Sequence, residues 1–165
     1  MEFTIAAMEE MHRERVLDMM RTFYASAAVL TNGSEEIFTA DIDACISDNP
    51  YLEGFVFCRG EELLGYGMAA KSFSTEFGKP CIWIEDLYVT SAHRGKGIGR
   101  RVAQALIARG QSLGFSKISA GDIYDWNEPS RALFTSLGFV PREKTKHGYR
   151  YELNLTSREV AHHAD

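Results

Sequence analysis

Glu85-Asp86-Leu87-Tyr88-Val89 ends a predicted strand, and four residues later the chain continues as Arg94-Gly95-Lys96-Gly97-Ile98-Gly99-Arg100. Glycines crowd the turn, and apolar side chains at helical spacing predict an amphipathic helix over 97–113. Glycine lets the backbone approach a ligand closely, and free amides at a helix N-terminus present partial positive charge to an anion. This strand, turn and helix predict a cradle for a diphosphate.

Two familiar phosphate-binding motifs do not fit this stretch. A P-loop needs Ser or Thr after Gly-Lys, whereas Gly97 follows Lys96 here. A dinucleotide-binding motif starting at Gly95 needs a third glycine at the position of Arg100. Both motifs are therefore disfavoured by residue identity.

The rest of the chain alternates predicted strands and helices. Strands are expected at 3–6, 55–57, 63–69, 81–89, 117–121, 139–140 and 149–155, and helices at 9–28, 34–48, 97–113 and 129–137. Residues 72–79 are predicted to form a loop. Mixed strands with helices between them predict an α/β (α+β) sandwich.

Composition places the chain among single-domain globular proteins. It has 165 residues, 45% of them hydrophobic and 25% charged, and we expect one domain over 1–155 followed by a polar tail at 156–165. No apolar run approaches the roughly 20 residues of a membrane helix, and the N-terminus shows no signal-peptide pattern, which predicts a cytoplasmic protein. Three dispersed cysteines without a Cys-x-x-Cys pair, and a His162-His163 pair in the tail, predict no metal site.

Charge is divided unevenly along the chain. Residues 1–90 hold 16 acids and 6 bases, whereas residues 91–165 hold 7 acids and 12 bases. A nucleic-acid-binding protein would more often be basic overall, so no nucleic-acid partner is expected. An acidic first half would attract a cationic small molecule if those acids gather on one face.

The sequence resembles the GNAT superfamily of acyl-CoA-dependent N-acetyltransferases. Arg94, Gly97 and Gly99 match its signature, and the resemblance extends upstream through 82–89 and downstream through Asp125-Trp126-Asn127-Glu128-Pro129-Ser130 and 133–139. Residues 72–141 carry the specific match. Within the superfamily, this stretch is most similar to the diamine and polyamine (spermidine/spermine) acetyltransferase branch.

The resemblance implies a twisted mixed sheet of six or seven strands flanked by four helices, with acetyl-CoA as co-substrate and no metal. It implies direct transfer of acetyl to a primary amine in a ternary complex. Dimers are common among similar proteins, so a homodimer is an expectation from the resemblance alone. The residues it assigns to the cofactor are Leu87, Tyr88, Val89, Arg94, Gly95, Lys96, Gly97, Ile98, Gly99, Arg100, Asn127, Pro129, Ser130 and Phe134.

Acetyl transfer needs a group that removes a proton from the amine, since a lysine-like amine with a pKa of about 10.4 is protonated at neutral pH. Glu85 is the leading candidate, because regular alternation would place it on the apolar face of Trp83, Leu87 and Val89, where burial raises a carboxyl pKa. Asp86 is the alternative, since a β-bulge would exchange the two.

The sequence lacks the tyrosine that the resemblance would lead one to expect as proton donor to the leaving thiolate. Many family members carry tyrosine at the position of Phe134, and we name Tyr124 as a replacement, with Tyr88 and Tyr149 as alternatives. A thiol with a pKa of about 8.5 can also leave as the anion. The missing phenol keeps open a second hypothesis, a module that binds acyl-CoA without turnover.

The acceptor is expected to be cationic: a polyamine, a basic amino acid or its analogue, or a peptide amine. Acids of the first half would form its site. The acceptor-binding candidates are Glu35, Glu85 and Asp122.

Overall fold

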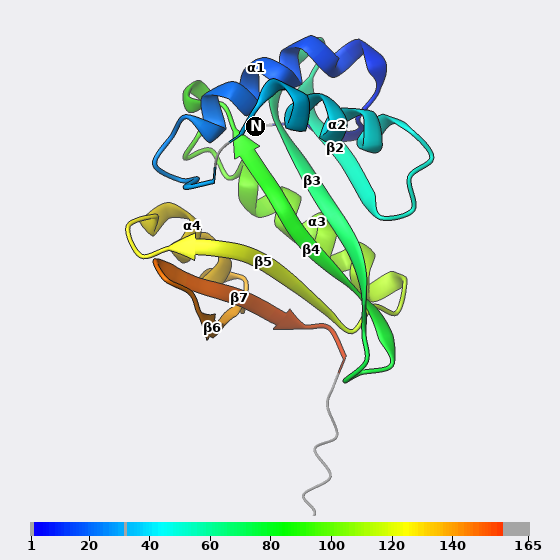
Figure 1. Ribbon diagram of the computed structural model, residues 1–165, viewed down its shortest axis with the longest axis vertical. Coiled ribbons are helices and arrows are strands. Elements are labelled where there is room, and N and C mark those ends of the chain that lie inside the picture. The colour runs from blue at the N-terminus through cyan, green and yellow to red at the C-terminus, as the bar shows by residue number, and fades with distance from the viewer. Residues whose placement is uncertain (1, 32, 157–165) are drawn as a thin grey trace, which may run out of the picture.

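The computed structural model describes residues 2–31 and 33–156. A seven-stranded sheet with the order β1-β2-β3-β4-β5-β7-β6 runs through them (Figure 1). Its strands are β1 (Thr4–Ala7), β2 (Leu52–Arg59), β3 (Glu62–Ser74), β4 (Lys79–Val89), β5 (Lys117–Tyr124), β6 (Val140–Lys144) and β7 (Gly148–Asn154). The helices are α1 (Arg13–Tyr24), α2 (Glu35–Ile46), α3 (Ile98–Ser112) and α4 (Glu128–Ser136). Strands β4 and β5 run parallel, and the other neighbouring pairs are antiparallel.

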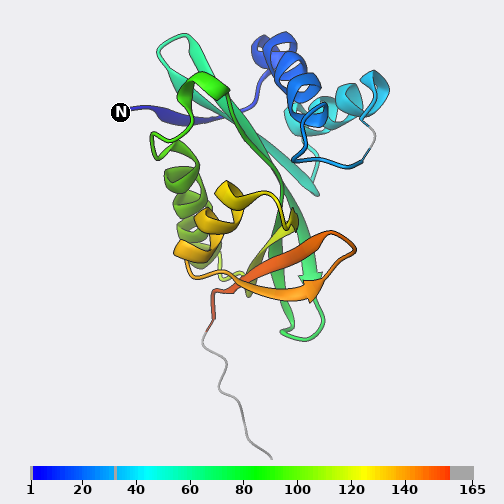
Figure 2. The ribbon, with the colours of Figure 1, turned by 90° about the vertical axis from the view of Figure 1, so that its left-hand side faces the viewer.

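Helices cover the sheet from both sides (Figure 2). Helices α1 and α2 pack on one face through a core that includes Val16, Met20 and Ile42. Helices α3 and α4 pack on the other through a core that includes Val102 and Phe134. The apolar stripes seen in the sequence are buried against the sheet, and the expected mixed sheet with four flanking helices is confirmed.

Two predicted helices match the structure closely at both ends. Gly97 is the N-cap of α3, and Gly114 follows its last turn with φ of 71°. Asn127 caps α4 by accepting a hydrogen bond from the Ser130 amide, and Gly138 follows that helix with φ of 89°. Capping groups and left-handed glycines therefore set the boundaries of both helices, which lie within one residue of the predicted ones.

The first predicted helix is wrong at both ends. A short 3-10 helix, Glu10–His12, precedes α1, and α1 stops at Tyr24 instead of continuing to Ala28. The Ser26 hydroxyl donates to the Phe23 carbonyl at 2.6 Å and accepts from the Ala28 amide at 3.3 Å. These local side-chain bonds compete with helical hydrogen bonds and end the helix early.

The predicted loop over 72–79 is also wrong. Strand β3 continues to Ser74, β4 starts at Lys79, and Phe73 pairs with Pro80 across the hairpin. This end of the hairpin extends below the part of the sheet that α1 and α2 cover (Figure 1). Its residues face solvent, so they lack the apolar alternation that marks a half-buried strand. Strands β5 and β6 likewise extend three and four residues beyond their predicted ends.

Candidate active site

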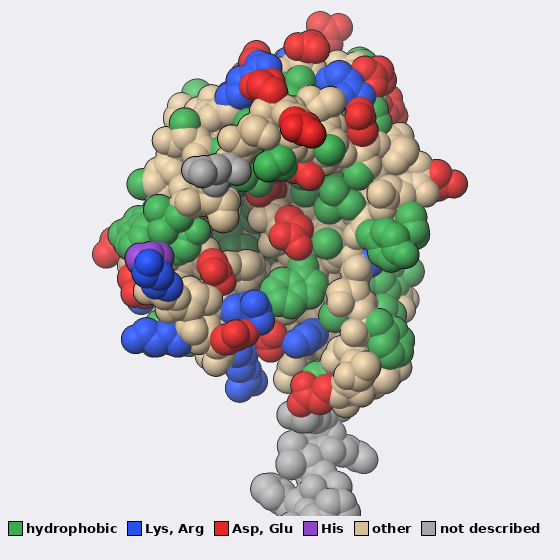
Figure 3. All heavy atoms as spheres, in the orientation of Figure 1, with side chains coloured by type: hydrophobic (Ala, Val, Ile, Leu, Met, Phe, Trp, Pro, Cys, Tyr) green, Lys and Arg blue, Asp and Glu red, His purple; other side chains and the backbone are tan. Residues whose placement is uncertain are grey.

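Strands β4 and β5 diverge halfway along their length. Their pairing ends at Ile84 and Ala120, although β4 continues to Val89 against β3 and β5 continues to Tyr124 against β7. A cavity of about 780 Å³ lies at this divergence. Figure 3 shows it as a hollow in the face below α1 and α2.

The backbone of β4 turns hydrogen-bonding groups toward the cavity. The Thr90 amide donates to the Leu64 carbonyl of β3 at 2.9 Å. Alternation along the strand turns the peptide groups of Tyr88 toward β3 as well, and those of Leu87 and Val89 toward the divergence. The Val89 carbonyl accepts from Arg94 Nε at 2.9 Å. The Leu87 and Val89 amides therefore face the cavity, where β5 does not pair with them.

The glycine loop forms one end of the cavity. Gly95 and Gly97 have φ of 72° and 79°, and a Cβ on either would meet no atom within 4 Å. Glycine is therefore needed here for its backbone conformation. The loop delivers the chain into α3, whose first amides have no partner within the helix. Gly95, Ile98 and Gly99 line the cavity, which gives the predicted geometry for an anion.

The basic side chains of the loop are not equivalent. Arg94 lines the cavity, with its guanidinium carbon 5.4 Å from the centre of the Tyr88 ring. Lys96 donates to the Ala92 carbonyl at 2.8 Å, and Arg100 donates to Ser136 Oγ at 2.7 Å. Lys96, Gly97 and Arg100 are not among the residues that line the cavity, so Arg94 is the basic side chain best placed for a phosphate.

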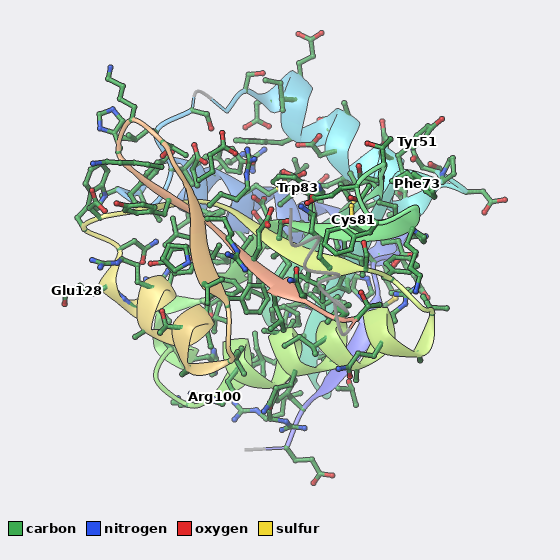
Figure 4. The ribbon with its side chains drawn as sticks, turned by 90° about the horizontal axis from the view of Figure 1, so that it is seen from below. Tyr51, Phe73, Cys81, Trp83, Arg100 and Glu128 are labelled. Atoms are coloured by element: carbon green, nitrogen blue, oxygen red, sulfur yellow. The ribbon has the colours of Figure 1, made fainter. Side chains whose placement is uncertain are left out.

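Helix α4 closes the cavity beside α3. Asn127, Pro129, Ser130 and Phe134 all line it, as predicted for the cofactor segment. Figure 4 shows α4, with Glu128 at its start, beside the helix that carries Arg100. The two helices approach so closely that a Cβ on Gly99 would lie 3.4 Å from Leu133 Cδ2.

A β-bulge separates the two acids of β4. Met68 pairs with Asp86 and the next residue, Ala69, pairs with Ile84, which leaves Glu85 as the extra residue. Beyond the bulge the faces exchange, so Leu87 and Val89 pack against the α3 core together with Ile84, and Asp86 faces α1 and α2. The expectation of regular alternation, with Glu85, Trp83, Leu87 and Val89 on one face, is therefore wrong.

Asp86 lies among phenols on the α1 side of the sheet. Its side chain accepts from the Tyr66 hydroxyl at 2.8 Å and from the Tyr24 hydroxyl at 3.4 Å, and the residue is 5% exposed. Burial raises the pKa of Asp86 to about 6, with Asp41 and Glu85 adding to the rise and the two phenols opposing it. Asp86 is therefore a carboxylate that can exchange a proton near neutral pH.

Three further acids line the same cavity: Asp41, Glu85 and Asp122. Burial raises the pKa of Asp41, and burial together with the charge of Asp41 raises the pKa of Glu85. Asp41 was missing from the predicted acceptor site. Its position on α2 gave no signal in sequence beyond a cluster of acids.

The predicted acceptor residue Glu35 lies elsewhere. Its carboxylate accepts from Arg21 Nε at 2.7 Å, its side chain is 62% exposed, and it is not among the residues that line the cavity. Glu35 therefore lies outside the cavity, and its carboxylate is held in an ion pair with Arg21 of α1.

The three tyrosines proposed to assist the leaving thiolate occupy different places. Tyr124 lines the cavity, and its hydroxyl oxygen accepts from the Leu30 amide at 3.3 Å. Tyr88 also lines the cavity, and its ring packs 5.8 Å from that of Tyr66 in the α1 core. Tyr149 does not line the cavity. Phe134 is buried there and packs against Phe139.

Replacing Asp86 with asparagine should stabilise the protein in a pH-dependent way. The pKa of Asp86 in the folded protein lies above the ordinary value for an aspartate. The contribution of Asp86 to the free energy of unfolding is therefore fully present below about pH 4 and is lost as pH rises through about 6. We expect the variant to gain on the order of 3 kcal/mol in unfolding free energy at pH 7.5 and almost nothing at pH 4. Urea denaturation at both pH values measures this, and an equal change at both would contradict it.

Across 2–31 and 33–156, no helix has the length and apolar character needed to span a bilayer. The same residues contain no cluster of three His, Cys, Asp or Glu side chains suited to a metal ion. His162 and His163 lie outside the described residues.

Solved structures share this architecture over nearly the whole chain. The PaiA N-acetyltransferase from Thermoplasma acidophilum, in complex with coenzyme A, superposes with a TM-score of 0.71 at 13% identity and covers 93% of this chain and 99% of that one. The ribosomal-protein-S18-alanine N-acetyltransferase from Escherichia coli gives 0.69 at 14% identity, covering 97% and 98%. Identity this low supports the shared fold alone.

Sequence comparison reaches a curated relative. Thialysine N-epsilon-acetyltransferase from Bos taurus is 30% identical over 105 residues, which cover 62% of this chain and 60% of the bovine protein. The match therefore spans about three fifths of the length of that relative. The family model for acetyltransferases (GNAT) matches residues 14–139, which include the divergent strands, the glycine loop and all of α4 with its cap. The chain belongs to the acetyltransferase (GNAT) family.

Proposed function

We propose that the protein is an acetyl-CoA-dependent N-acetyltransferase that acts on a primary amine of a small cationic acceptor. The proposal rests on one observation. A single cavity is lined by the unpaired end of β4, by the glycine loop and by four acidic residues, Asp41, Glu85, Asp86 and Asp122. The loop suits a diphosphate, and the carboxylates suit a cation. The acceptor amine would attack the thioester directly while both substrates are bound.

The coenzyme would lie along the divergence of β4 and β5. The diphosphate fits against Arg94, Gly95 and the first amides of α3, and the pantetheine arm fits along Leu87 to Val89. Bound there, acetyl-CoA supplies an activated acyl group. The Leu87 and Val89 amides then stabilise the negative charge that develops on the thioester oxygen during attack.

Asp86 is the better candidate for the group that takes the amine proton. The bulge exchanges the two acids, which is the condition under which the sequence favoured Asp86 over Glu85. A base with a pKa of about 6 is ionised at neutral pH and accepts a proton more readily than an ordinary aspartate. Glu85 and Asp41 are then assigned to binding the cationic acceptor, since both line the cavity near Asp86.

The thiolate would leave as the anion or take a proton from Tyr124. Phe134 has no proton to donate, and Tyr124 is a lining phenol whose O–H stays available while its oxygen accepts from Leu30. A thiol with a pKa of about 8.5 is a tolerable leaving group without full protonation. The substitution at Phe134 also favours a second candidate function, a binding module without turnover.

Release of free thiol distinguishes these two functions. A disulfide reagent would follow coenzyme A release from acetyl-CoA in the presence of spermidine, lysine analogues, a peptide with a free N-terminus, and neutral amines. We expect release with cationic amines and its loss in the Asp86→Asn variant. Saturable binding of acetyl-CoA with no release for any amine would support the binding module.

The cationic class of the acceptor rests on the cavity acids and on the name of the bovine relative, whose thialysine substrate is a basic amino acid analogue. Isothermal titration in the presence of coenzyme A measures this preference directly. Tight binding of only neutral or anionic amines would contradict the assignment.

A further inference from the structure

An aromatic bridge joins the acceptor side of the cavity to its cofactor side. We define it as Tyr124, the last residue of β5, and Trp126, which lies between β5 and α4; their rings stack with centres 5.0 Å apart. His147, from the β6–β7 turn, lies 5.8 Å from the Trp126 ring. The bridge directly precedes Asn127, the cap of the predicted cofactor segment.

Two hydrogen bonds connect this bridge to the segment 26–31, which follows α1. Trp126 Nε1 donates to the Ala27 carbonyl at 2.8 Å, and the Leu30 amide donates to the Tyr124 hydroxyl at 3.3 Å. Figure 1 shows the segment after α1 beside the connection between β5 and α4. Residues 99 and 94 positions apart in the chain are thereby held together.

Segment 26–31 is part of the cavity wall. Ser26, Ala28, Val29 and Thr31 line the cavity on the side of Tyr24 and Asp41, where the cationic acceptor is proposed to bind. The backbone hydrogen bonds of this segment are local: the Ser26 amide donates to the Phe23 carbonyl, and the Val29 amide donates to the Ser26 carbonyl. Its position relative to the cofactor side of the cavity therefore depends on the bridge.

Building on the proposed function, we infer that Trp126 and Tyr124 are positioning residues that couple coenzyme binding to the acceptor wall. Coenzyme A that contacts Asn127 and Ser130 limits the motion of the start of α4. Because the aromatic bridge is hydrogen-bonded to residues 26–31, the motion of that segment is limited as well. Occupancy of the cofactor site then orders the wall before the amine binds. Coupling of this kind appears as an equal and reciprocal change in the affinities of the two ligands.

Hydrogen exchange on the full chain tests the coupling without a known acceptor. In the wild type, saturating coenzyme A should slow amide exchange of residues 26–31 by about 5- to 10-fold. Trp126→Phe keeps an aromatic ring but removes the indole N–H, so this protection should fall to less than 2-fold. Coenzyme A affinity by titration should stay within 2-fold of wild type. Tyr51→Phe is the control, because Tyr51 is highly exposed and is not among the residues that line the cavity.

Tyr124→Phe provides a second variant, which removes the hydroxyl that accepts from the Leu30 amide. The same hydroxyl is proposed as a proton donor to the thiolate, so this variant is read by hydrogen exchange and not by turnover. It should abolish the protection of Leu30 in particular. Protection by coenzyme A that persists in both variants, or is absent from the wild type at saturation, would overturn the coupling. Failure of the proposed function would look different: coenzyme A would not bind at all, or it would bind without thiol release for any amine. In turnover assays with spermidine, Trp126→Phe should raise KM several-fold with little change in kcat.

Discussion

Replacing Asp86 with asparagine is expected to lower kcat/KM for a cationic amine by about 10²- to 10⁴-fold, the range typical for loss of a general base. The carboxylate that accepts from Tyr66 and Tyr24 is the most buried acid of the cavity, and burial raises its pKa to about 6. Wild-type kcat/KM should therefore rise with pH through about 6, since only the ionised form accepts a proton. This rise of kcat/KM near pH 6 should be absent from the Asp86→Asn variant, as measured by thiol release from pH 5 to 9.

Glu85→Gln is the matched comparison, because it removes a carboxylate one residue away on the same bulge. If Glu85 binds the acceptor cation, its loss should mainly raise KM for the amine and leave the rise of kcat/KM near pH 6 intact. If Glu85→Gln lost the rise of kcat/KM near pH 6 while Asp86→Asn kept it, Glu85 and not Asp86 would be the general base.

Tyr66→Phe should raise the pKa of Asp86, because it removes a hydrogen bond that favours the ionised form.

Arg94→Ala is expected to weaken acetyl-CoA binding by about 10- to 100-fold, the size of the loss when a charged hydrogen bond is removed. Arg94 lines the cavity, donates to the Val89 carbonyl and lies over Tyr88. Its loss removes a charge facing the proposed diphosphate and also releases the end of β4. Titration with acetyl-CoA at several salt concentrations measures both affinity and the electrostatic share of it.

Arg100→Ala serves as the control for that experiment. Arg100 belongs to the same loop-and-helix motif, but its guanidinium donates to Ser136 and does not line the cavity. We expect its loss to change the affinity by less than 3-fold. A larger effect at Arg100 than at Arg94 would contradict the orientation of the diphosphate given above.

Patterns local in sequence predicted most of the fold and the cofactor side of the cavity. The glycines at 97, 114 and 138 and the cap at Asn127 act within a few residues, so their consequences are visible in the chain itself. The resemblance of residues 72–141 to an acetyltransferase family then pointed to the loop and helix that line one side of the cavity. Segment 26–31, by contrast, could not be placed, because its contacts with Trp126 and Tyr124 span more than 90 residues.

The acceptor side depended on features that only the assembled sheet decides. The bulge at Glu85 arises from the register between β3 and β4, and no residue type in β4 marks it. Glu35 and Asp41 are six residues apart on α2, which places them about 120° apart around the helix. Sequence shows both as acids of one helix, but only the packing of α2 determines that Asp41 enters the cavity and Glu35 pairs with Arg21.

The most direct test of the proposed site is a titration of ¹⁵N-labelled protein with acetyl-CoA, followed through its backbone amide resonances. Saturable shifts should appear at Leu87, Val89 and the first turn of α3, with smaller shifts at Asn127 and Ser130. ATP at the same concentration should not reproduce the shifts of Leu87 and Val89. Absence of saturable shifts at millimolar acetyl-CoA, or shifts confined to other parts of the molecule, would contradict the placement of the coenzyme between β4 and β5.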